Sequence, residues 1–186
     1  MMQAICDATG RIVAHVEPAH HNLPTPCSAW NVHDLANHLL ATLELGRALL
    51  SDEMPTVQTG PGQVPPVDLV GDDLVGAYKT GSKALVAATT ADAVGRVHVT
   101  PLGEMPGAGL AGFAGLDVLV HGWDLATAIG IDATIDPSLA EPMLAFACQA
   151  IGDNNDMRAP RIGPEVAVAA DADPTSRLVA YLGRTP

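Results

Sequence analysis

Apolar residues recur at helical spacing along most of this chain, and they divide it into amphipathic segments. The first expected helix covers residues 2–16 and stops before a proline. After a proline-rich connector at residues 23–30, Asn31 has the side chain of an N-cap, and Asp34 places a favourable negative charge in the first turn. The second helix is therefore expected to run from Asn31 to about Ser51.

The middle of the chain predicts a long loop, two more helices and a short strand. Residues 52–70 contain four prolines and two glycines, and a loop of this length is uncommon unless it covers something. A third helix is expected at about residues 72–89. The alternation of residues 96–100 is typical of a short strand. The fourth helix is expected at about residues 108–129 and ends at Gly130, which suits the left-handed C-cap position.

The C-terminal third predicts smaller elements. Asp136 and Pro137 form a cap and first-turn pair for a fifth helix, which Pro142 is expected to kink or delay. Residues 153–156 superficially resemble a calcium loop but lack its glycine and its closing glutamate, so they are expected to form a turn. A short last helix is expected before Gly183.

The fold class follows from the balance of these segments. Four long amphipathic stretches dominate, and residues 165–168 are expected to pair with residues 97–99 in a small peripheral β-pair. Hydrophobic residues make up 48 % of the chain and aromatic residues only 3 %, so the core must consist mainly of Ala, Leu and Val, which suits packed helices. We expect an all-α, up-and-down type four-helix bundle with extra short helices, as a single domain spanning residues 1–186.

Acidic residues outnumber basic ones, with 21 Asp and Glu against 9 Lys and Arg and a formal net charge of −12. Such a surface repels phosphate backbones and anionic lipids, so we expect no nucleic-acid or membrane partner. No apolar run approaches the roughly 18 residues of a membrane span, and residues 1–16 lack the features of a secretory signal. The three cysteines Cys6, Cys27 and Cys148 form no disulfide or zinc-knuckle pattern, so a reducing cytoplasm is expected. The expected partners are a small molecule and a second copy of the chain in a homodimer.

Three polar residues lie on the apolar faces of the second and fourth helices. His38 shares its face with Leu35, Thr42, Leu45 and Leu49. Asp117 and His121, four residues apart, share theirs with Leu110, Ala114, Leu125 and Ala128. Buried polar groups need partners. Two imidazoles and a carboxylate converging from two packed helices are a standard means of holding a divalent metal with an open coordination position.

Each candidate also has a purely structural interpretation. A buried imidazole such as His38 often bonds a backbone carbonyl, and Asp117 with His121 equally forms a hydrogen-bonded pair that fixes helix register. Asp34 is either the helix cap or a carboxylate that orients the His38 ring. Cys27 is expected to be a small packed side chain rather than a nucleophile, because no activating base is evident beside it.

Several motifs, taken together and in order, resemble those of one protein family. Residues 25–30, Thr-Pro-Cys-Ser-Ala-Trp, with the Asp-Leu and His-Leu pairs of residues 34–39, resemble the opening signature of the mycothiol-dependent maleylpyruvate isomerase N-terminal domain family. Residues 120–126, Val-His-Gly-Trp-Asp-Leu-Ala, resemble its second signature. Residues 163–184 resemble the tail of an actinobacterial stand-alone branch, so the resemblance covers nearly the whole chain.

The resemblance implies a DinB-like four-helix bundle that binds a divalent metal through two histidines and an acid on facing helices. His38 matches the first ligand, His121 matches the last, and Asp117 occupies the acid position, where the isomerase pattern has glutamate. Zn²⁺ is the expected metal, with Ni²⁺ as a rival. Related proteins use the metal to activate a low-molecular-weight thiol, mycothiol, for isomerisation or transfer. The isomerase also has a smaller substrate-binding domain for which this sequence leaves no room, so isomerisation of maleylpyruvate itself is not expected.

Two classes of function remain open from the sequence. The first is a metal- and mycothiol-dependent transferase or isomerase that acts on small electrophiles. The second is a non-catalytic metal-binding bundle with a structural, sensing or assembly role. An open coordination position with affinity for a thiol favours the enzyme, whereas a site closed by a fourth protein ligand favours the structural role.

Overall fold

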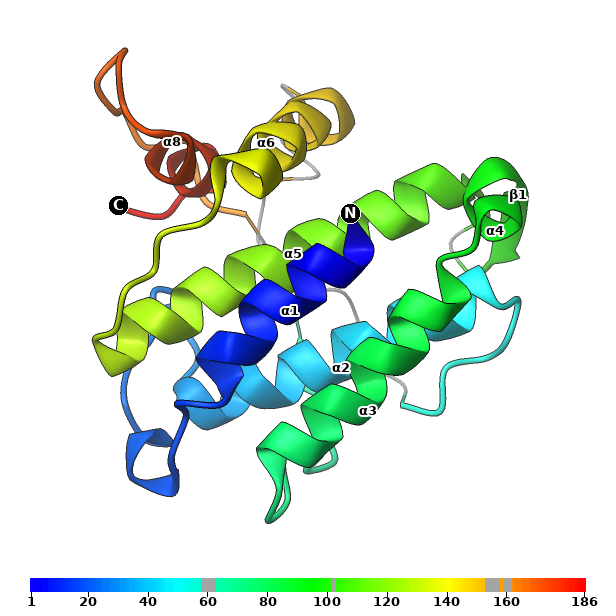
Figure 1. The fold of residues 1–186 in the computed structure, drawn as a ribbon, viewed down its shortest axis with the longest axis horizontal. Helices are drawn as coiled ribbons and strands as arrows, with labels where there is room; N and C mark the ends of the chain where they lie inside the picture. The colour runs from blue at the N-terminus through cyan, green and yellow to red at the C-terminus, as the bar shows by residue number, and fades with distance from the viewer. Residues whose placement is uncertain (58–62, 102, 153–157, 159–161) are drawn as a thin grey trace.

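Four helices form the body of the molecule (Figure 1). The computed structural model describes residues 1–57, 63–101, 103–152, 158 and 162–186. The four helices are α1 (Met2–Val13), α2 (Val32–Leu50), α3 (Leu74–Ala88) and α5 (Gly107–Ile129). Both α1 and α2 pack against α3 on one side and α5 on the other, which closes a four-helix bundle. The expected all-α bundle is confirmed.

The order of helices around the bundle differs from the up-and-down arrangement expected from the sequence, in which consecutive helices are neighbours. Here α1 and α2 occupy diagonal corners, and the connection between them includes a short 3₁₀ helix (Pro18–His20). As a result α2 and α5, which are far apart in the sequence, pack directly on each other. The residues of the candidate site lie on these two helices.

Capping side chains fix the start of α2 and the end of α5. Asn31 accepts a hydrogen bond from the backbone N–H of Asp34, and the Asp34 carboxylate accepts one from the N–H of Asn31, which is a reciprocal capping box. Gly130 ends α5 in the left-handed conformation, with φ 73°. Both caps agree with the sequence, and Asp34 acts as the helix cap rather than as a partner of His38.

The β-structure differs from the prediction. Strand β1 (Val97–Thr100) pairs with β2 (Gly103–Pro106) in an antiparallel hairpin, not with residues 165–168. Residues 165–168 form no strand, and the N–H of Val166 instead donates to the carbonyl of Ala180. A local hairpin is favoured because it closes a much shorter loop than a pairing across some 70 residues.

The C-terminal part forms a smaller layer beside α5 (Figure 1). Helix α6 (Pro137–Ile151) begins at the predicted Asp136 cap, and it contains Pro142, which therefore does not delay its start. Helix α8 (Pro174–Tyr181) packs against α6. A one-turn helix α4 (Ala91–Gly95), capped by a threonine, was not predicted. The turn predicted at residues 153–156 lies outside the described residues.

The core is built mainly from aliphatic and alanine side chains, as the composition requires. Helix α5 is buried along much of its length because it contacts α1, α2 and α6. None of the helices in the described part of the chain is long and apolar enough to cross a membrane.

A close approach between α1 and α5 depends on Gly122. A Cβ atom at this position would lie 2.6 Å from the Thr9 hydroxyl oxygen, and that hydroxyl donates to the carbonyl of Val118.

We therefore expect Gly122→Ala to lower the free energy of unfolding by about 1–3 kcal/mol in urea titrations of metal-free protein. The matched control is Gly109→Ala in the same helix, where a Cβ meets nothing within 4 Å. That change should be neutral or stabilising by up to about 1 kcal/mol, and equal effects at both positions would contradict this packing argument.

Candidate metal centre

The three predicted polar residues meet between α2 and α5. Asp117 lies between the two imidazoles: its Oδ2 is 3.3 Å from Nε2 of His38, and its Oδ1 is 3.1 Å from Nε2 of His121. The two imidazole rings are perpendicular, with centroids 5.0 Å apart. Both rings are buried, whereas 36 % of the Asp117 side chain is exposed. The structure therefore brings together the residues that the sequence singled out, at a point that solvent reaches.

Each imidazole is held by its other nitrogen. Nδ1 of His38 donates to the carbonyl of Gln63 at 2.9 Å, and Nδ1 of His121 donates to the carboxylate of Asp124 at 2.9 Å. A carbonyl oxygen only accepts, and a carboxylate accepts strongly, so the proton of each neutral ring is placed on Nδ1. In this neutral form, which a bound cation requires, the Nε2 lone pairs point into the space around Asp117. This is the arrangement in which histidines bind metals.

The spacing of the donor atoms suits a small divalent cation. Two donors that are each about 2.0–2.1 Å from a tetrahedral zinc ion lie about 3.3 Å apart. The two imidazoles lie 3.3 and 3.1 Å from the two oxygens of Asp117, and the possible ligand atoms all lie within 4.8 Å of one another. The Thr42 hydroxyl donates to Oδ2 of Asp117 at 2.5 Å and lies 3.5 Å from Nε2 of His38. Thr42 therefore fixes the carboxylate between the rings.

The loop over α2 is anchored beside His38. The Asn37 side chain donates to the carbonyl of Val67 at 2.8 Å and accepts from the N–H of Leu69 at 2.6 Å. These bonds hold the chain after Gln63 against α2, so that the Gln63 carbonyl reaches His38. The proline-rich loop expected to cover something thus contributes directly to the site.

The electrostatics of the metal-free site favour an ion pair. Burial alone would lower the pKa of His121, but the charge of Asp117 and hydrogen bonds with Asp117 and Asp124 raise it well above its usual value. Burial alone would raise the pKa of Asp117, but the charge and hydrogen bonds of His121 and the bonds with His38 hold it well below its usual value. A cation entering the site must therefore displace a proton from His121.

A second group of donor atoms lies behind His121. Cys27, Asp124 and Nδ1 of His121 are close enough to hold a metal, with Sγ of Cys27 3.3 Å from Asp124 and 4.0 Å from Nδ1. A cation already lies there, because Nη2 of Arg184 is 2.9 Å from Asp124 and 3.5 Å from Sγ of Cys27. Of the two groups, the one at His38, Asp117 and His121 is thus the stronger candidate for a metal site.

The connector before α2 forms one wall of the site. Thr25 accepts from the N–H of Cys27, and its hydroxyl lies within hydrogen-bonding distance of the carbonyls of Cys27 and Trp30. The loop places Trp30 beside both imidazoles, with ring centroids 4.7 Å from His38 and 6.0 Å from His121. Trp30 thus shields the histidine rings from water.

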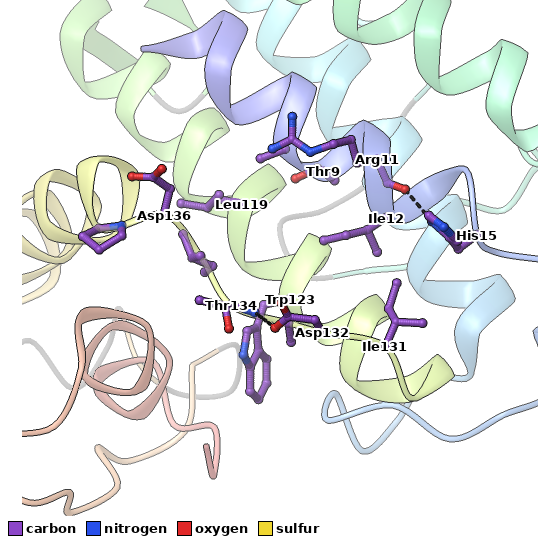
Figure 2. A pocket seen from close by; sticks show the side chains of 14 residues that line it. Thr9, Arg11, Ile12, His15, Leu119, Trp123, Ile131, Asp132, Thr134 and Asp136 are labelled. Atoms are coloured by element: carbon purple, nitrogen blue, oxygen red, sulfur yellow. Dashed lines mark hydrogen bonds between the residues drawn. The ribbon is translucent and has the colours of Figure 1, made fainter.

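A separate cavity of about 630 Å³ lies between α1 and the segment that joins α5 to α6 (Figure 2). Its lining includes Leu119 and Trp123, which are two residues from His121 on either side and so face away from it on the helix. His15 at its edge bonds back to the carbonyl of Arg11 at 2.8 Å. This cavity contains none of the three candidate ligands and is not part of their site.

Besides the Gln63 carbonyl, the side chains of three residues near the site were given no role there by the sequence analysis. Asp124, three residues after His121, was visible in the second signature but was given no role. Cys27 was expected to lack a neighbouring base, yet it lies beside His121 and Asp124. Arg184 comes from the other end of the chain, and no local pattern reveals that it contacts Asp124. Of these three, only Asp124 could have been found from the sequence, because its spacing of three residues from His121 places both side chains on one helical face.

Comparison with known sequences shows the family. Residues 2–126 match the mycothiol maleylpyruvate isomerase N-terminal domain, and this chain belongs to that family. Two uncharacterized proteins of Mycobacterium tuberculosis, from two strains, are each 33 % identical to it over 183 residues, which cover 96 % of this chain and 93 % of theirs. The resemblance drawn from the motifs is confirmed.

Comparison with solved structures shows the fold. A crystal structure of a histidine-to-alanine mutant of mycothiol-dependent maleylpyruvate isomerase superposes with a TM-score of 0.60 at 16 % sequence identity. The match covers 81 % of this chain, which spans about two thirds (66 %) of the length of that isomerase. The DinB-like bundle is therefore confirmed.

The shifted pKa values predict how the pH affects the stability of the metal-free protein. The raised pKa of His121 contributes stability that is complete below the unfolded value of 6.5 and is lost as the pH rises through the folded value. The lowered pKa of Asp117 contributes stability that is complete above 3.8 and is lost as the pH falls through the folded value. The stability difference between wild type and Asp117→Asn should therefore be largest between about pH 4 and 6.5. Urea titrations that show a constant difference from pH 5 to 9 would contradict the ion pair.

Proposed function

We propose that this protein binds one divalent cation through His38, Asp117 and His121 and acts as a mycothiol-dependent transferase or isomerase on small electrophiles. One observation carries the proposal: both Nε2 atoms face a single, partly exposed carboxylate while both Nδ1 atoms are bonded to acceptors. Two histidines that served only the core would not need to converge through Nε2 on one partly exposed carboxylate while both Nδ1 atoms are already bonded. The family supports the thiol as the co-substrate.

Zinc is the metal that we expect, with nickel as a rival. Imidazole and carboxylate donors suit both ions, and the greater availability of zinc should decide between them. The donor spacing fits the short bonds of zinc. Calcium is disfavoured, because it prefers six to eight oxygen ligands at longer distances.

The chemistry follows from the charge of the site. A divalent cation held by two neutral imidazoles and one carboxylate keeps a net positive charge and favours the anionic form of a bound water or thiol at neutral pH. The side chains of the protein prepare the site for this role. Asp124 and Gln63 orient the imidazoles, Thr42 fixes the carboxylate, and Trp30 limits access of water. A thiolate formed there adds to an electrophilic carbon or displaces a leaving group from it.

A non-catalytic role is the alternative. A structural metal site is closed by four protein ligands, whereas a catalytic one keeps a position for water or substrate. Among the described residues, the group at His38, Asp117 and His121 has three possible ligand side chains, and Asp117 is partly exposed. These features favour the enzyme over the structural, sensing or assembly role.

Metal content tests the site directly. After reconstitution with Zn²⁺ and removal of excess, wild type should retain about one ion per chain by elemental analysis, and His38→Ala/His121→Ala should retain almost none, because two of three donors are lost. The matched control is His15→Ala/His33→Ala, which removes two imidazoles outside this group and should leave the stoichiometry unchanged. Equal zinc in wild type and in His38→Ala/His121→Ala would show that the proposed site is wrong.

Thiol consumption tests the reaction. Zinc-loaded protein should accelerate the loss of free thiol when mycothiol is mixed with a panel of small electrophiles, and His121→Ala should lower the rate by at least about 100-fold, in line with the loss of a group that stabilises the anion. The assay follows thiol colorimetrically and product mass by spectrometry. If zinc binds at the three residues but no electrophile is consumed faster than in buffer with free zinc, the non-catalytic role is favoured instead.

A further inference from the structure

The end of the chain reaches the back of the candidate metal centre. The guanidinium of Arg184 donates two hydrogen bonds to the Asp124 carboxylate: Nη2 lies 2.9 Å from Oδ2, and Nε lies 3.3 Å from Oδ1. Asp124 is fully buried, and 11 % of the Arg184 side chain is exposed. The same Oδ2 atom accepts the hydrogen bond from Nδ1 of His121. A continuous chain of contacts therefore runs from Arg184 through Asp124 to His121.

The backbone conformation around Arg184 directs its guanidinium group toward Asp124. Gly183 has φ +83°, and a Cβ there would lie 2.6 Å from the Cα of Gly163, so the position requires glycine. The N–H of Arg184 donates to the carbonyl of Val179, and its Nη1 donates to the carbonyl of Leu182. These bonds fold the tail back on the end of α8 and direct the side chain inward.

An imidazole that is free to rotate would be a poor metal ligand, so His121 needs a fixed partner at Nδ1. A carboxylate that Arg184 did not hold could turn away from His121, and its hydrogen bond with Nδ1 would then no longer fix the ring. The imidazole could then rotate and exchange its two nitrogens. The two donors of Arg184 prevent this, because together they hold the Asp124 carboxylate in one orientation.

We propose that Arg184 is a positioning residue of the metal centre, which acts through Asp124 to keep Nε2 of His121 directed at the metal position. The proposal rests on the proposed metal site. It assigns a role to a residue outside the segment that matches the family, residues 2–126. The C-terminal layer thereby completes a site whose three direct ligands all lie in the bundle.

The test compares metal binding in four purified full-length variants with wild type: Arg184→Lys, Arg184→Met, Asp124→Asn and Arg177→Met. Affinity for Zn²⁺ is measured by competition with a chromophoric chelator, and the geometry of the site by the visible spectrum of the Co²⁺ form. Both Arg184 variants and Asp124→Asn should bind zinc about 10–100-fold more weakly, the usual loss for a partner of a metal-bound histidine. Their Co²⁺ bands should shift in energy or intensity. Arg177, exposed on α8, is the matched control and should leave both readouts unchanged.

A double-mutant comparison separates positioning from simple charge neutralisation. If Arg184 acts through Asp124, then Arg184→Lys should weaken zinc binding in the wild-type background but add no further loss in the Asp124→Asn background. Should Arg184→Met fail to fold, as judged by circular dichroism, Asp124→Asn/Arg184→Met removes both buried charges and is used in its place. It should show the same loss as Asp124→Asn alone.

Two results would overturn the proposal. Wild-type affinity and an unchanged Co²⁺ spectrum in Arg184→Lys and in the Met-containing variant would show that the contact only neutralises a buried charge, while the metal site itself stands. Failure of wild type to bind Zn²⁺ or Co²⁺ at all would instead remove the proposed metal site, and the positioning role with it.

Discussion

The contact between α2 and α5 is the constraint on which the rest of the structure depends, because it brings the imidazoles of His38 and His121 within 3.3 and 3.1 Å of one carboxylate, that of Asp117. His121 is the central residue: its Nε2 faces Asp117, and its Nδ1 is bonded to Asp124. Both nitrogens of one buried ring are thereby committed to carboxylates that come from the same helix, one turn before and one turn after it. Helix α5 therefore supplies the imidazole of His121 and both of its carboxylate partners, Asp117 and Asp124.

The core consists mainly of alanine, leucine and valine side chains, so the linked polar groups around His121 would be destabilising if they were left without partners. In such surroundings an unpaired carboxylate or imidazole loses its hydration without compensation, so each group has to find a partner. The described residues satisfy this condition: none of their buried side-chain nitrogen or oxygen atoms lacks a hydrogen bond. The partners of His121 extend to Arg184 at the far end of the chain, so the position of the C-terminal layer and the geometry of the site are fixed together.

The sequence predicted the part of this arrangement that is local. The spacing of four residues placed Asp117 and His121 on one face of one helix. The capping residues Asn31 and Gly130 correctly predicted the start of α2 and the end of α5. Periodicity describes the face of a single helix and carries no information on which distant segment covers it. For that reason the roles of Cys27 and Arg184 were missed. Residues 165–168 were likewise expected to pair with β1, whose partner is in fact β2.

The choice of aspartate rather than glutamate at the acid position is compatible with this packing. A carboxylate that is one methylene shorter reaches both imidazoles only if the two helices lie close together. They do: a Cβ at Gly46 of α2 would lie 3.0 Å from the Cβ of Ala114, one turn from Asp117 on α5. Small residues at the point of contact allow the backbones to approach, and the shorter side chain then spans the gap to His38 with a contact of 3.3 Å. The aspartate between the two imidazoles and the small residues beside it are therefore best understood as one structural solution.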